Sequence, residues 1–138
     1  KHVAMSYHKT LLNYCDRLEK IADALPDMID KQECLVIARQ IYPVICKAHR
    51  FEEQELFPVL NASQNPNDAT PKNLERLQFE HWEDESFAEE VSEALQTYVL
   101  NTDKVFSDKL GYMLRGLFEG LRRHIAFEAE FLLPKLQA

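Results

Sequence analysis

Four histidines and two glutamates recur along the chain in two matching halves. Each half carries one isolated histidine and then a His-x-x-x-Glu segment that is soon followed by leucine and proline. Imidazole nitrogens and carboxylate oxygens in helical bundles are typical ligands of iron, manganese and zinc. The pattern therefore predicts a metal site with the ligands His8, His49, Glu53, His81, His124 and Glu128.

Four predicted helices would position these residues. The 3.6-residue spacing of apolar side chains and the prolines that end it predict helices over about residues 2–25, 30–60, 70–100 and 104–133. An Asp-Lys-Gln-Glu sequence at residue 30 resembles a capping box, and Pro43 is expected to kink the second helix without ending it. Residues 61–70 form a polar loop. These lengths and connections predict an all-α fold, an up-down-up-down antiparallel four-helix bundle, with residues 1–138 as a single domain.

Helix geometry brings the four histidines to one level of this bundle. A rise of 1.5 Å per residue places all of them roughly 9–16 Å from the same end. At 100° per residue, Glu53 and Glu128 lie roughly 30° from the centre of an apolar stripe, whereas Glu52 lies roughly 60° from His49. We therefore expect Glu53 and Glu128 to point into the core next to the histidines, with Glu52 as a weaker candidate.

The carboxylates and imidazoles at this level need a cation. Buried carboxylates are costly unless they are paired or bound to metal, and no lysine or arginine lies near them on the same stripes. One buried histidine is usually a core residue, but four that converge with two carboxylates predict a metal site. If both glutamates bridge, each of two ions gains two nitrogens and two oxygens. An octahedral ion then keeps positions for a bridging oxygen and a small molecule.

Composition argues against several other classes of function. The chain has 138 residues, with 16 basic and 23 acidic side chains and a net charge of -7, which would repel a phosphate backbone or an anionic membrane. We expect no nucleic-acid and no membrane partner, and no stretch is apolar enough to predict a transmembrane helix. Three cysteines without a Cys-x-x-Cys spacing favour reduced thiols and a cytoplasmic location.

The two halves resemble the hemerythrin-like, HHE cation-binding family over residues 8–134. The resemblance lies in the two His-x-x-x-Glu segments, the leucine and proline after each, and the histidine before each: His8, His49, Glu53, His81, His124 and Glu128. It implies a bundle that holds a non-haem di-iron centre, with these six residues as ligands of two iron ions joined by an oxo or hydroxo bridge. Other divalent metals could enter such a site in vitro. Family members include oxygen carriers, oxygen or iron sensors, and di-iron proteins linked to nitric oxide stress and iron–sulfur cluster repair.

One position departs from the oxygen carriers of this family. Those carriers have a second histidine one turn further along the third helix, where this chain has Glu85. Glu85 lies roughly 70° from the centre of its apolar stripe, at the edge of the core. It is either a seventh metal ligand or a solvated residue. Four histidines with two glutamates resemble the repair and stress-response members more than the carriers.

The expected ligand of such a centre is a small diatomic molecule or peroxide. Leu12, Ile45 and Leu121 lie one helical turn from a predicted ligand histidine. Together with Cys46 they either wall a dry pocket for a gas or pack as ordinary core. Our leading hypothesis is a di-iron protein that binds or senses oxygen, nitric oxide or peroxide, in iron handling or a stress response. The alternatives are a di-iron oxidase or peroxidase, a metal-sensing module of a longer protein, and a metal-free interaction bundle. A second copy of the chain or a redox partner is also compatible with the sequence.

Overall fold

The computed structural model describes residues 1–62 and 70–136. Its elements are α1 (His2–Ala24), α2 (Lys31–Phe51), the π-helical segment η1 (Glu52–Leu56), α3 (Phe57–Leu60), α4 (Thr70–Leu100), α5 (Lys104–Phe131) and the short 3-10 helix η2 (Leu133–Lys135). No strand occurs in the described ranges. Of the polar loop predicted over 61–70, residues 63–69 lie outside the described residues, and residue 70 already belongs to α4.

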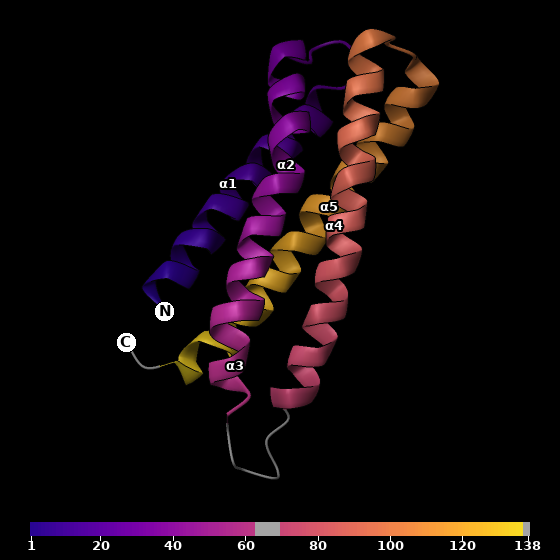
Figure 1. Ribbon diagram of the computed structural model, residues 1–138. Coiled ribbons are helices and arrows are strands. Elements are labelled where there is room, and N and C mark those ends of the chain that lie inside the picture. The colour runs from indigo at the N-terminus through magenta and orange to yellow at the C-terminus, as the bar shows by residue number, and fades with distance from the viewer. Residues whose placement is uncertain (63–69, 137–138) are drawn as a thin grey trace.

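α1, α2, α4 and α5 are the long helices of the described residues, and they run side by side (Figure 1). α2, η1 and α3 follow one another without a break and act as one helix, so the fold is an all-α four-helix bundle, as predicted. α1 packs against α2 and α5, and α4 packs against the same two helices. The first turn of α1 and the last turn of α5 lie at the end of the bundle that also holds α3.

Two aspartates begin helices where the sequence predicts a start. Asp30 accepts hydrogen bonds from the backbone N–H groups of Gln32 and Glu33, which have no partner within the first turn of α2. Asp103 accepts one backbone N–H at the start of α5. α2 continues through Pro43, as expected from the apolar pattern on both sides of it. The residues at which α2 and α5 begin determine the height in the bundle at which these two helices place their polar residues.

A buried polar layer separates two apolar clusters. The large cluster contains the buried residues of α1, α2, α4 and α5 on one side of this layer, among them Leu11, Ile45, Leu95 and Leu121. The small cluster lies near α3 and contains Ala4, Leu56, Phe57, Leu60, Leu74, Leu77, Leu132 and Leu133. The buried polar residues between them are His8, His49, Glu52, His81 and Glu128. Each of the four long helices contributes to this layer.

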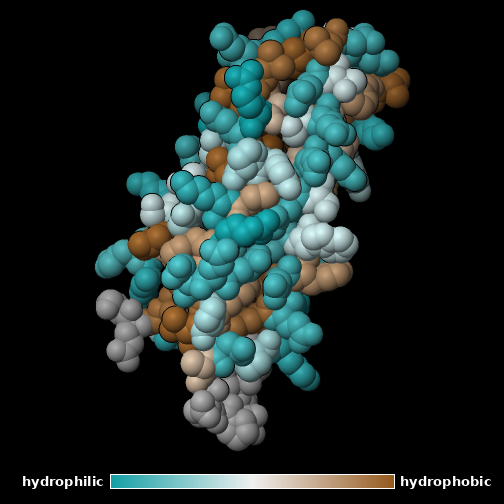
Figure 2. Space-filling model, viewed as in Figure 1, coloured by the Kyte–Doolittle hydropathy of each residue, from teal (hydrophilic) through white to brown (hydrophobic). Residues whose placement is uncertain are grey.

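The outward faces of the helices meet water. On the face seen in Figure 2, hydrophilic side chains cover most of the surface. Among the described residues, no helix is both long enough and apolar enough to cross a membrane.

Candidate metal centre

Three buried side chains from different elements meet in the polar layer. Nε2 of His8, on α1, lies 3.3 Å from Oε1 of Glu128 on α5 and 3.6 Å from Oε1 of Glu52 in η1. One possible ligand atom from each of the three residues lies within 4.8 Å of the other two. Imidazole nitrogen and carboxylate oxygens at these separations form a site that a divalent cation can occupy.

His81 lies on α4, the one long helix not yet represented in this group. Its Nε2 lies 2.9 Å from Oε2 of Glu52, yet neither atom has a hydrogen bond among the described residues. Buried polar atoms are almost always paired, so two that meet without a hydrogen bond need another partner. A metal ion suits both an imidazole nitrogen and a carboxylate oxygen. The donor set therefore fits a metal ion.

The charges in this layer depend on one another. Burial opposes a positive charge on His8 and His81, but the attraction of the nearby buried glutamates prevails and raises the pKa of each imidazole to about 9. Burial would also raise the pKa of Glu52, but its close contacts with the two histidines lower it. The pKa of Glu128 is raised, because repulsion from Glu52 adds to the effect of burial. Without metal, two imidazolium groups thus balance the buried carboxylates.

His49 joins the layer by stacking on His81. The two ring centroids lie 3.7 Å apart and the ring planes differ by 4°. Nδ1 of His49 lies 3.0 Å from Oε2 of Glu85 on α4. Burial and the nearby charge of His81 lower the pKa of His49, although the hydrogen bond with Glu85 acts in the opposite sense. His49 is therefore neutral near pH 7, which is the form of imidazole that binds metal.

His124 lies beside the layer and is less buried. Its side chain is 22% exposed, with Nδ1 2.7 Å from Oδ2 of Asp84 and Nε2 3.2 Å from Oε2 of Glu80, both on α4. The hydrogen bond with Asp84 raises the pKa of His124. The structure thus gathers three of the predicted histidines in the buried layer and holds the fourth against α4.

Glu52, and not Glu53, is the buried carboxylate of its helix. Glu52 is 2% exposed, whereas the side chain of Glu53 is 22% exposed and contacts Nδ1 of His81 at 3.1 Å. A rotation of 100° per residue predicts the opposite. Residues 52–56 form a π-helix, so a regular rotation of 100° per residue does not apply to them. Leu56, Phe57 and Leu60 are all buried, so the apolar residues that follow do not distinguish Glu52 from Glu53.

The acidic residues of α4 near His81 are not solvated as a group. The side chain of Glu85 is 13% exposed and contacts His49, which excludes the solvated alternative. Glu80 and Asp84, which the sequence pattern does not single out, contact His124. Their signal is position, since they lie four residues apart and therefore on one face of α4.

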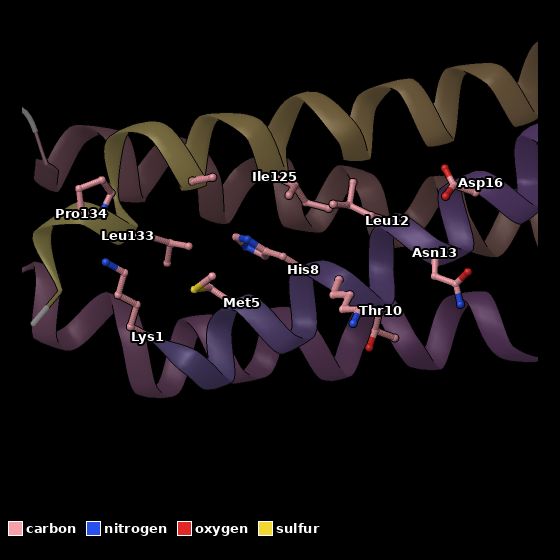
Figure 3. A pocket seen from close by; sticks show the side chains of 12 residues that line it. Lys1, Met5, His8, Thr10, Leu12, Asn13, Asp16, Ile125, Leu133 and Pro134 are labelled. Carbon is pink, nitrogen blue, oxygen red and sulfur yellow. The ribbon is translucent and has the colours of Figure 1, made fainter. Parts of the chain in front are cut away.

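A pocket of about 820 Å³ opens between α1 and α5 and reaches His8. Figure 3 shows His8 in its middle, with Lys1 and Pro134 toward one end and Asp16 toward the other. Leu12 lines this pocket and is 38% exposed, because the neighbouring Leu11 takes the inward position on α1. Leu12, Ile45 and Leu121 therefore do not wall one pocket, and of the two alternatives core packing applies to Ile45 and Leu121. These last two residues pack in the large cluster.

Comparison with known proteins gives one match. The model of the hemerythrin HHE cation binding domain matches residues 2–136, nearly the whole chain. Searches of curated proteins and of solved structures return no match.

Proposed function

Because the chain belongs to the hemerythrin HHE cation-binding domain family, we propose that it is a non-haem di-iron protein that binds or senses a small molecule. The candidates for that molecule are oxygen, nitric oxide and peroxide, and the setting is iron handling or a stress response. The three cysteines are free thiols, which supports a location in the reducing cytoplasm.

The observation that carries this proposal is the meeting of unpaired donor atoms in the buried layer. Nε2 of His81 and Oε2 of Glu52 have no hydrogen bond, and Nε2 of His8 lies beside both Glu52 and Glu128. An unpaired buried polar group costs on the order of 1–3 kcal/mol, and a cation bound between Nε2 of His81 and Oε2 of Glu52 would remove that cost. The convergence supports a bound cation as the missing partner.

The ligand set that we propose differs from the sequence prediction in one residue. Glu52 would replace Glu53 as the carboxylate that holds metal together with Glu128, because Glu52 is the one that faces His8 and His81. The proposed ligands are His8, His49, Glu52, His81, His124 and Glu128. His124 has to turn from Glu80 toward the layer to take part.

Two irons held by these residues would supply an open coordination position for a small molecule. The pocket at His8 supports an approach to that position from the surface between α1 and α5. Met5, Leu12 and Ile125 give the pocket an apolar lining near His8. Such a lining favours an uncharged molecule such as a dissolved gas over a charged metabolite.

Metal analysis tests this proposal. We expect iron in the purified protein, or after anaerobic incubation with Fe(II), together with changes in the absorption spectrum when argon is replaced by air or by nitric oxide. Replacing Glu52 and Glu128 together by glutamine should remove the iron and both spectral responses. Fewer than about one iron per chain in the native protein after reconstitution would contradict the proposal.

A further inference from the structure

The outward face of α4 carries two exposed aromatic side chains that contact each other. Phe79 is 57% exposed and Trp82 is 66% exposed, and their ring centroids lie 6.1 Å apart. Of the aromatic ring pairs among the described residues, this is the one in which both rings are exposed. Aromatic residues, tryptophan above all, are enriched where proteins bind one another, so an exposed pair indicates a binding surface.

Exposed glutamates continue this face along the helix. Spacings of three, four and seven residues place them on the same side of α4 as the two rings. None of these glutamates forms an ion pair or a hydrogen bond with another described residue. We call this face the α4 stripe, and it consists of Phe79, Trp82, Glu83, Glu89, Glu90 and Glu93.

The net charge of the whole chain arises from the part of α4 that carries the stripe. Residues 77–100 contain seven acidic side chains and no lysine or arginine, whereas the remaining residues contain the other 16 acidic side chains and all 16 basic ones. Three of the seven acids, Glu80, Asp84 and Glu85, contact histidines. The four glutamates of the stripe are therefore the ones left to face a partner, and a concentrated negative charge attracts a cationic one.

This charge also decides between possible occupants of the stripe. Nucleic acid and anionic membranes are repelled by it. A second copy of the chain that paired through the same face would bring the two sets of glutamates against each other. A cationic protein segment suits both parts of the stripe, because its lysines and arginines meet the carboxylates while its apolar side chains or a stacked guanidinium cover the rings.

From these observations we propose that the α4 stripe is a docking surface for a positively charged segment of another protein. Phe79 and Trp82 are its apolar anchor, and the four glutamates select the partner by charge. The stripe runs roughly 21 Å along α4, the length of a helical segment of about four turns. The proposal goes beyond the metal-binding function and does not depend on it, since none of these side chains belongs to the polar layer.

Trp82 reports on this surface directly, because it is the only tryptophan of the chain. The probe is a tryptophan-free amphipathic helical peptide of about 18 residues, with lysine and arginine on one face and leucine on the other. We expect this peptide to shift the fluorescence emission of Trp82 in a saturable manner. Raising the salt from about 50 mM to about 500 mM should weaken its binding by about tenfold or more, because salt screens exposed charges.

Calorimetric titration with the same peptide separates the two parts of the stripe. The double variant Phe79→Ser and Trp82→Ser should weaken binding by about tenfold or more, because it removes the anchor. The triple variant Glu83→Gln, Glu89→Gln and Glu90→Gln should weaken it to a similar extent, because it removes charge without removing apolar surface. All five positions are exposed, so both variants keep the fold, which circular dichroism verifies.

Matched controls on α5 distinguish the stripe from exposed aromatic or acidic residues in general. Tyr112→Ser removes an aromatic side chain that is 85% exposed. The triple variant Asp108→Asn, Glu119→Gln and Glu130→Gln removes three negative charges from other exposed positions. Both controls should bind the peptide within about twofold of the native protein, because substitutions outside an interface change affinity little.

Several results would overturn the proposal. One is an unchanged Trp82 emission with the peptide at about 1 mM, and another is binding by the stripe variants that equals that of the controls. A larger Trp82 response to vesicles of anionic phospholipid, or to the same peptide with glutamate in place of lysine and arginine, would exclude a cationic partner. Self-association that the Phe79→Ser and Trp82→Ser variant abolishes would assign the face to a second copy of the chain.

Discussion

Nε2 of His81 and Oε2 of Glu52 lie 2.9 Å apart in the interior of the bundle without a hydrogen bond between them. The same carboxylate lies 3.6 Å from Nε2 of His8 through its other oxygen. Glu52 thus reaches toward histidines of two different helices at once, as a bridging carboxylate would. The neighbouring Glu53 has one described contact with an imidazole, which is with Nδ1 of His81.

The first prediction separates these two adjacent glutamates. Glu52→Gln should lower the iron content of the reconstituted protein to about half or less, because a neutral amide is a poor bridging ligand. Glu53→Gln should keep the native iron content and weaken affinity by about 10–100-fold. Elemental analysis after gel filtration measures the content, and equal losses in the two variants would contradict the assignment.

The second prediction concerns metal removal. A ligand that binds only the folded state at 100 times its dissociation constant stabilises it by about 2.7 kcal/mol. We therefore expect the unfolding temperature to fall by roughly 5–15 °C after chelation. The double variant His49→Ala and His124→Ala should show almost no change on chelation. Differential scanning calorimetry with and without chelator makes the comparison, and an unchanged temperature in the native protein would favour a metal-free bundle.

The third prediction tests which face of α1 packs against the core. Leu11 is 2% exposed and Leu12 is 38% exposed, so Leu11→Ala should lower the free energy of unfolding by about 2–5 kcal/mol. Leu12→Ala should lower it by less than about 1 kcal/mol. Urea unfolding of the two metal-free variants measures both values. A larger cost for Leu12→Ala would mean that the apolar stripe runs through Leu12.

The fourth prediction concerns the pocket at His8. Ala129 lines the pocket on α5, and a tryptophan there should fill part of it. Ala129→Trp should slow the reaction of the reduced iron protein with nitric oxide by about tenfold without changing its iron content. Ala126→Trp is the matched control, because Ala126 is exposed on the same helix and does not line this pocket. Stopped-flow spectroscopy gives the rates, and equal rates in both variants would exclude this route.

The fifth prediction is a dependence of stability on alkaline pH. Burial raises the pKa of the Cys15 thiol from its ordinary value of 9.0 to about 12. A raised pKa means that the unfolded chain loses its proton first. The stabilisation is therefore complete below pH 9 and is lost as the pH rises toward 12.

Cys15→Ala isolates this effect, because its cavity costs the same free energy at every pH. The difference in unfolding free energy between the native protein and the variant should shrink above pH 9, by at most about 1.4 kcal/mol per pH unit. Urea titrations at several pH values measure it. A difference that stays constant up to pH 11 would mean that the thiol is not protected by folding.

Local sequence signals account for most of the fold. Asp30 and Asp103 begin helices in the structure because an aspartate before an apolar-periodic segment pairs with free backbone N–H groups whatever surrounds it. Pro43 does not end α2, since the residues on both sides keep the same buried face. Such signals depend on neighbours within one turn and can be read from the chain.

The site is predicted less completely, because it depends on contacts between helices. The level of His8, His49 and His81 follows from counting along each helix, and the structure places all three in one buried layer. The choice between Glu52 and Glu53 depends on a π-helical segment that a regular rotation per residue does not anticipate. His124 pairs with acidic residues of another helix, and such pairing is invisible in the spacing of one helix.

The polar layer also determines which parts of the protein should unfold locally first. It cuts the interior into a large cluster and a small cluster, so the apolar contacts on its two sides are not continuous. In the metal-free state we expect backbone amides around the small cluster to exchange with deuterium sooner than those around the large one, as two units of different local stability. Ions bound across the layer would tie all four helices together, and the two units would then exchange as one.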